Sequence, residues 1–322
     1  MHKMPFYPLA IMLLIGTGGY LGCDPNTIKV PPGEEQTASS IPQYAASIPE
    51  KSPSTVLIGS FNMQRLGKSK LNNPWVMEKF AAIVTRFDVL ALQEINSKDL
   101  PAVQILVDQI NAAGYKYSFT ISPRIGRTSY FEQYAFVFDT EKIRSGNEFS
   151  YVVQDQADLL HREPFVGRFQ AITSNAQPFQ FTLINIHTDP DEIKEELDVL
   201  ADVYNSVRKY EYPEDDVLLL GDLNAPPQKM QRLVSIPAFV PLIVDLPTNT
   251  RKSKTLDNIL VDSQTTREFT GRAGTIDLEE MFSVDQKTAL EISDHLPVWA
   301  EFSIVERAVT STAFNSGQGL VR

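Results

Sequence analysis

The sequence predicts one α/β domain of about 250 residues, in which two β-sheets pack together and helices cover their outer faces. Between residues 55 and 306, short apolar runs rich in β-branched residues alternate with segments whose apolar residues recur at helical spacing. No segment repeats at a fixed period, which excludes a solenoid. A unit of this size buries roughly three quarters of its unfolded surface, so a large core is available.

The elements follow in order along the chain. The spacing of apolar residues predicts a helix over residues 74–87, since Pro74 suits a first helical turn. A second helix over residues 100–113 should end at Gly114, and the longest should cover residues 191–210. Uninterrupted apolar runs such as TVLIGSF and DVLALQ predict strands over residues 55–61, 88–93, 134–138, 165–172, 179–186, 217–220, 256–261 and 297–304.

The composition is that of a globular protein with an acidic balance. Hydrophobic residues make up 43% and charged residues 21%, which excludes wholesale disorder. The net charge of −11 argues against a protein that coats nucleic acid through one broad basic face. It is compatible with an enzyme that touches a few phosphates and holds a cationic metal. The single cysteine, Cys23, excludes an internal disulfide framework and a cysteine-based zinc cluster.

Both ends of the chain differ from the domain between them. Residues 1–23 combine Lys3, a short apolar run and small residues, which predicts a signal peptide and export. Leu21-Gly22-Cys23 resembles the end of a bacterial lipobox, so we expect Cys23 to be lipidated and to anchor the protein to a membrane; the alternative is a plain signal peptide. Residues 24–54 should form a disordered tether and residues 307–322 a flexible tail, because both lack apolar periodicity.

Polar residues stand at the ends of the apolar strands. Each one alone is ordinary for a strand end, but six such positions together predict a site at one rim of the sheets. Its members would be Asn62, Glu94, His187 with Asp189, Asp222 with Asn224, Asp257 with Asn258, and Asp294 with His295.

This set of residues predicts the hydrolysis of a phosphodiester. Oxygen ligands from Glu94, Asp222, Asn62 and Asn224 suit a hard cation such as Mg²⁺, or else Mn²⁺, whereas no spacing of histidines or cysteines supports zinc. Two histidines suit general acid–base work near neutral pH if a carboxylate orients each of them. One imidazole would deprotonate water and the other would protonate the leaving oxygen.

Eight strings occur in order along the chain: IGSFNMQ, LALQEI, GRTSYFEQYAFVF, REPFVGRF, INIHTDP, LLLGDLNA, TLDNIL and ISDHLPVWAEF. Together they resemble the endonuclease/exonuclease/phosphatase superfamily over essentially all of residues 55–304. LQE, GDLN and SDHLP resemble the superfamily as a whole, whereas SYFEQYAF and REPFV resemble its deoxyribonuclease I branch. The resemblance implies a four-layer sandwich of two mostly antiparallel sheets flanked by helices.

The resemblance also implies roles for individual residues. It makes His187 and His295 the acid–base pair, oriented by Glu132 and Asp257. The metal set that it implies is Glu94 with Asn62, Asp222 and Asp294 nearby. The residues that it implies for contact with the phosphate, backbone or groove are Asn224, Arg162 and Tyr130. The planar fork of an arginine such as Arg162 is well suited to a phosphate.

Two positions depart from the deoxyribonuclease I pattern. Gln64 and Asn96 stand where relatives place arginines that enter the DNA minor groove, so we expect weaker binding of duplex DNA and less suppression by salt. Cations that would supply charge nearby are Arg65, Lys68, Lys70, Lys98 and Arg127. Structural calcium cannot be inferred, although Asp155, Asp158 and Asp245 are candidate ligands, and His161 reads as an exposed loop residue.

Three functions remain open at this point. The first is an exported, monomeric, metal-dependent endonuclease whose substrate is DNA. The second is another phosphoesterase of the same fold, such as a sphingomyelinase-like enzyme, which the expected anchor and the acidic charge favour. The third is a catalytically dead binding module, against which the presence of both histidines and all the carboxylates argues.

Overall fold

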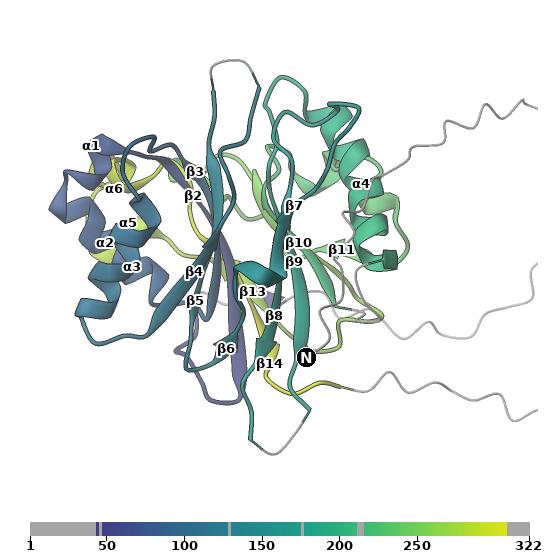
Figure 1. Ribbon diagram of the computed structural model, residues 1–322, viewed down its shortest axis with the longest axis horizontal. Coiled ribbons are helices and arrows are strands. Elements are labelled where there is room, and N and C mark those ends of the chain that lie inside the picture. Colours follow the sequence, from purple (N-terminus) through teal and green to yellow (C-terminus); the bar gives the residue numbers. More distant parts are fainter. Residues whose placement is uncertain (1–42, 45–46, 128–129, 175–176, 211–215, 308–322) are drawn as a thin grey trace, which may run out of the picture.

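The computed structural model describes residues 43–44, 47–127, 130–174, 177–210 and 216–307. The expected signal peptide with Cys23, most of the expected tether and nearly all of the expected tail lie outside these residues. Two β-sheets lie face to face at the centre, with helices on both outer faces (Figure 1). This arrangement confirms the α/β sandwich that the sequence predicts.

Strands from distant parts of the chain build both sheets. The first sheet has the order β1 (Gln43–Tyr44), β13 (Phe269–Thr275), β14 (Val298–Ser303), β2 (Thr55–Leu66), β3 (Val89–Ile95), β5 (Gln133–Asp139) and β4 (Tyr117–Ile121). The second has the order β11 (Phe239–Pro241), β12 (Asp257–Asp262), β10 (Val217–Asp222), β9 (Gln180–His187), β8 (Phe165–Ala171) and β6 (Ile143–Arg144), and β7 (Ser150–Val152) also pairs with β8. Most neighbouring strands are antiparallel; β1 with β13, β2 with β3, and β9 with β10 are parallel.

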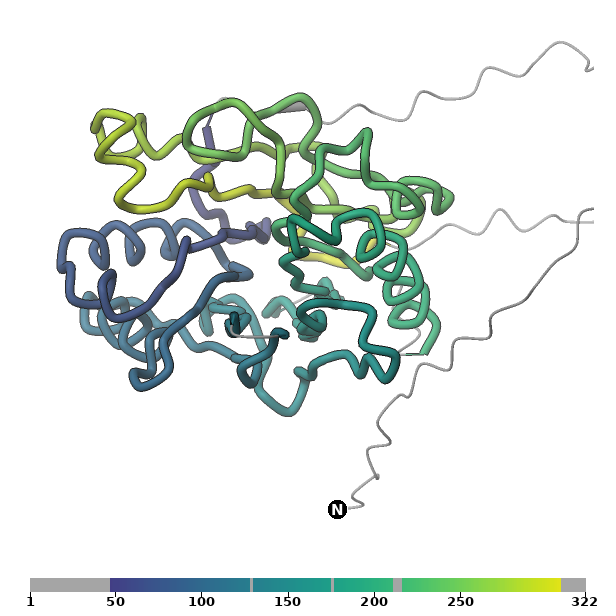
Figure 2. The backbone as a smooth tube through the Cα atoms, turned by 90° about the horizontal axis from the view of Figure 1, so that it is seen from above, coloured from purple at the N-terminus to yellow at the C-terminus, as the bar shows by residue number. Residues whose placement is uncertain are grey.

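The helices form the two outer layers (Figure 1). The first sheet is covered by α1 (Lys68–Leu71), α2 (Pro74–Val84), α3 (Ala102–Ala112), α5 (Leu278–Phe282) and α6 (Gln286–Ile292), and the second by α4 (Ile193–Tyr210). Short 3₁₀ turns are η1 (Asn147–Phe149), η2 (Pro227–Lys229) and η3 (Leu233–Ser235). Seen from above, the first half of the chain lies mostly in the lower part of the view and the second half in the upper part, so each half contributes to both sheets (Figure 2).

Local signals account for the helix ends. The Asn73 side chain accepts the Val76 N–H at 3.3 Å, and Pro74 follows it in the first turn of α2. In α4, acidic residues lie in the first turn and basic residues in the last, which suits the helix dipole. Among the described residues, no helix is both long enough and apolar enough to cross a bilayer.

The expected strands and the three expected helices all form, with shifted ends. Sequence patterns missed the short strands β1, β6, β7 and β11. They also missed β4, which is interrupted by Ser118 and Thr120, and β13, which contains Gly271 and Gly274. The short helices α1, α5 and α6 were missed as well. The first strand continues to Leu66 through a register shift after Asn62.

The packed domain begins before Thr55. The Lys51 ammonium lies 2.9 Å from the fully buried Asp88 carboxylate and also donates to Asp139. Ile48 packs against the core between the first sheet and its helices. The last residues of the segment expected to be a tether therefore contact the domain.

Candidate active site

Three of the expected residues lie side by side on neighbouring strands of the second sheet. Asp222, the last residue of β10, lies beside His187 of β9 in parallel register and beside Asp257 of β12 in antiparallel register. Gly221 permits the close approach of β9: its φ is +146°, and a Cβ there would lie 1.9 Å from the Ile186 carbonyl oxygen. Only glycine fits beside β9 at this point.

The first sheet contributes Asn62 and Glu94 from the opposite side of the site. Both lie near strand irregularities, and Glu94 has a left-handed φ of 58°. The buried Asn62 Nδ2 donates to Glu94 Oε1 and to Asp222 Oδ2, at 3.0 Å each. One amide group therefore joins carboxylates from both sheets.

Two carboxylate–imidazole pairs face this centre. His187 Nδ1 lies 3.0 Å from Glu132 Oε1, and His295 Nδ1 lies 2.9 Å from Asp257 Oδ2. Both distances fall in the hydrogen-bonding range expected of such pairs. The second ring nitrogens, His187 Nε2 and His295 Nε2, each lie 3.5 Å from the same atom, Asp222 Oδ2.

The electrostatics of the site favour protonated imidazoles. Burial opposes the charged form of His187, but Glu132 and Asp222 outweigh it and raise its pKa to about 9. Burial likewise opposes the charged form of His295, yet Asp257 and Asp222 raise its pKa above the ordinary value. Burial would raise the pKa of Asp222, but the two imidazoles and the Asn62 amide outweigh it and lower this pKa.

The structure also places the residues expected to contact substrate. Arg162 is only 2% exposed; its Nε donates to the His187 main-chain carbonyl at 2.9 Å, and its guanidinium lies 5.8 Å from the centre of the Tyr130 ring. The Tyr130 hydroxyl donates to Glu94 Oε2 at 3.1 Å. The Asn224 amide donates to the Thr188 carbonyl at 3.0 Å.

Asp294 lies at the rim of the site, with its Oδ1 4.0 Å from His295 Nε2 and a side chain 47% exposed. Asp189, also at a strand end, accepts from the Asp191 N–H and lies 3.5 Å from His161 Nδ1. His161 is therefore half-buried rather than an exposed loop residue.

The donor set fits a hard divalent cation. Ligand atoms of Asp222, Asp257 and His295 lie within 4.8 Å of one another, and Asp257 Oδ1 is buried without a hydrogen bond in the described part of the protein. Carboxylate oxygens of Glu94 and Asp222 converge on the Asn62 amide. Glu94 and Asp222 thus offer the carboxylate oxygens that Mg²⁺ or Mn²⁺ prefers, whereas Asp257 and His295 pair with each other through Nδ1.

The nearby cations divide into two groups. Lys70 donates to the Met63 and Ile292 carbonyls, and burial lowers its pKa to about 8; Arg127 pairs with Asp158 and Glu192. Lys70 and Arg127 are therefore occupied by contacts within the protein and do not supply free positive charge beside the site.

Arg65, Lys68 and Lys98 make no ion pair with the described residues. Arg65 has a left-handed φ of 63°, and its guanidinium lies 5.9 Å from the centre of the Tyr130 ring. This cation is therefore connected to the site through Tyr130.

The candidate calcium ligands do not converge. Asp155 accepts the Leu160 N–H at 2.7 Å, and Asp158 is engaged by Arg127. Neither these two residues nor Asp245 belongs to a group of metal-ligand side chains in the described ranges.

Sequence reasoning missed Thr248 and Glu196. The Thr248 hydroxyl donates to Asp257 Oδ2 at 2.7 Å, and the buried Glu196 carboxylate accepts two peptide N–H groups near the site. Nothing in the local sequence sets either residue apart.

Comparisons with known proteins match this architecture. The model of the Endonuclease/Exonuclease/phosphatase family matches residues 59–295. Deoxyribonuclease-1-like 1 of Chlorocebus aethiops is 32% identical over 77% of this chain and 84% of its own length, and deoxyribonuclease-1 of Gallus gallus is 30% identical over 79% and 94%. A family protein from Bacteroides thetaiotaomicron has the same fold, with a TM-score of 0.54 and 16% identity over 79% of this chain and 99% of its own.

Proposed function

Because this chain belongs to the endonuclease/exonuclease/phosphatase family, we propose that it is a divalent-cation-dependent phosphodiesterase that hydrolyses DNA. The observation that carries the proposal is the pair of carboxylate-oriented imidazoles whose Nε2 atoms flank one oxygen of Asp222. The relatives named deoxyribonuclease favour DNA as the substrate.

In the proposed mechanism, the two histidines move the protons. Nδ1 of each ring donates to its own carboxylate, which turns Nε2 toward the centre of the site. A water oxygen attacks phosphorus while one Nε2 takes its proton. This ring must start in its neutral form, and a cation held by Asp222 would favour that form by offsetting one of the carboxylates that raise the imidazole pKa. The bond from phosphorus to the leaving oxygen breaks, and the other Nε2–H protonates that oxygen.

The acidic residues have separate tasks in this proposal. Glu94 and Asp222, joined by Asn62, would hold a divalent cation, which when bound neutralises charge on the phosphoryl oxygens. Glu132 and Asp257 lie on the far sides of the rings, where they hold the orientation and the proton of each imidazole.

We also propose that the protein is exported. The support is the sequence of residues 1–23, with Cys23 as the expected site of a lipid anchor. Metabolic labelling with a fatty acid, with Cys23→Ser as the control, would test the anchor.

The activity is tested with the chain from residue 24 to residue 322, incubated with supercoiled plasmid in Mg²⁺ or in EDTA. Nicking that requires the divalent cation is the expected result. Release of choline phosphate from sphingomyelin without nicking would establish the alternative phosphoesterase. Turnover of neither substrate would leave a binding module and refute the proposal.

A further inference from the structure

We propose that Glu196, which lies outside the reaction centre, is a positioning residue that holds Arg162 and His187 in place relative to each other. The inference rests on the proposed function for its effect on rate, but its geometry stands independently. Glu196 lies in the first turn of α4 and its side chain is fully buried.

Each carboxylate oxygen of Glu196 accepts a peptide N–H from a different segment. Oε1 accepts the His161 N–H at 2.5 Å, and Oε2 accepts the Asp189 N–H at 2.6 Å. Both donors lie outside α4, so this acid does not act as an N-terminal cap of its own helix. It joins the segment before β8 to the segment after β9.

These two peptide groups flank residues of the site. His161 precedes Arg162, and Asp189 follows His187 by two positions. The Arg162 Nε donates to the His187 carbonyl at 2.9 Å and lies 3.5 Å from Glu132 Oε1. Glu196 therefore completes a ring of contacts that passes through Arg162, His187 and back to its own carboxylate.

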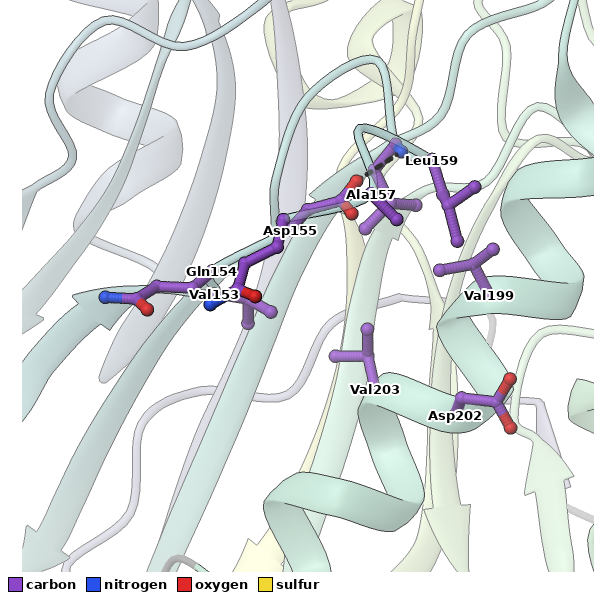
Figure 3. A pocket seen from close by; sticks show the side chains of 10 residues that line it. Val153, Gln154, Asp155, Ala157, Leu159, Val199, Asp202 and Val203 are labelled. Carbon is purple, nitrogen blue, oxygen red and sulfur yellow. Dashed lines mark hydrogen bonds between the residues drawn. The ribbon is translucent and has the colours of Figure 1, made fainter. Parts of the chain in front are cut away.

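Apolar packing holds both ends of the segment that precedes Arg162, since Val153 and Leu160 are buried in the same core cluster as the apolar residues of α4. Between these two residues, side chains of the segment and of α4 line a small hollow (Figure 3). Val199 and Val203 of α4 line the hollow. His161 follows directly after Leu160, so the hydrogen bond from its N–H to Glu196 extends the attachment of this segment to α4 as far as Arg162.

The chemistry calls for a carboxylate at this position. Two peptide N–H donors converge on the side chain, and a carboxylate can accept from both. A glutamine of the same shape would turn its NH₂ group toward one of these donors. That change removes one hydrogen bond and brings two donors face to face, which displaces the segment that holds Arg162.

The test compares Glu196→Gln with Glu195→Gln. Glu195 is exposed and lies in the same helical turn, so its substitution removes the same charge without touching the ring of contacts. Plasmid nicking in Mg²⁺ gives kcat and KM, and hydrogen exchange follows the amides of His161 and Asp189. For Glu196→Gln we expect kcat to fall roughly tenfold to a hundredfold with KM unchanged, because small misplacements of reacting groups cost rates of this size. Exchange should rise around these two amides alone.

Several results would overturn the inference. One is a Glu196→Gln protein as fast as Glu195→Gln; another is a loss of rate with exchange raised throughout the domain, which indicates a general structural role. If the wild-type chain cleaves no phosphodiester, the proposed function fails and exchange decides the inference alone. If Glu196→Gln does not fold, the wild-type chain still decides: amides of His161 and Asp189 that exchange as fast as that of the exposed Gln156 refute it.

Discussion

Glu132→Gln should slow the enzyme only through His187. In the metal-free protein, the surroundings of His187 raise its pKa from 6.5 to about 9, which corresponds to about 3 kcal/mol in favour of the imidazolium. Glu132 is the nearest acid, with its Oε1 3.0 Å from Nδ1. Burial opposes this rise and Asp222 supplies part of it, and from its net size we expect loss of the Glu132 charge to cost about 10²-fold in kcat.

A double-mutant cycle tests this dependence. His187→Ala alone should reduce kcat about 10³-fold, within the usual range for the loss of a general acid or base. If Glu132 acts through the imidazole, the double variant should be no slower than His187→Ala, because the carboxylate then has nothing to orient.

The assay is plasmid nicking in Mg²⁺, with urea unfolding of each variant to verify the fold. The exposed acid Asp191 gives a matched control, since Asp191→Asn removes a nearby negative charge that does not contact the His187 imidazole. A double variant slower by about 10⁵-fold, the product of both single effects, would mean that Glu132 acts independently and would refute the reasoning.

Three further predictions concern pH, salt and packing. In EDTA, the stabilisation from the raised pKa of His187 is complete below about pH 6.5 and is lost as the pH rises through about 9. Urea unfolding should therefore show that the free energy of unfolding falls across this pH range. The fall should be smaller in Glu132→Gln. Arg65→Gln should weaken duplex binding at low salt and reduce the slope of log K against log salt by about one unit, and an unchanged slope would exclude a phosphate contact. Gly221→Ala should cost about 3 kcal/mol or more of stability, because its Cβ would meet the Ile186 carbonyl; a thermal unfolding midpoint equal to wild type would contradict this.

The main outline of this protein follows from its sequence because the signals are local. Apolar runs mark the buried strands, and polar residues such as Asn62, Glu94 and Asp222 mark the points where those strands leave the core. The order of motifs is sufficient to indicate the family. The pairing of His187 with Glu132 was expected from the resemblance alone, since 55 residues separate the two and no local pattern connects them.

Tertiary structure alone decided which charged side chains are available and what they hold. Arg162, expected to contact a phosphate, is almost fully buried with its Nε donating to the His187 carbonyl, and Lys70, expected as a nearby cation, donates to two carbonyls. Glu196 reads as one more solvated acid in a first helical turn, yet it is fully buried between peptide groups 35 and 7 residues away. The physical reason is the same in each case: the cost of burying a charge is offset by partners that folding brings from remote segments, and no local pattern records them.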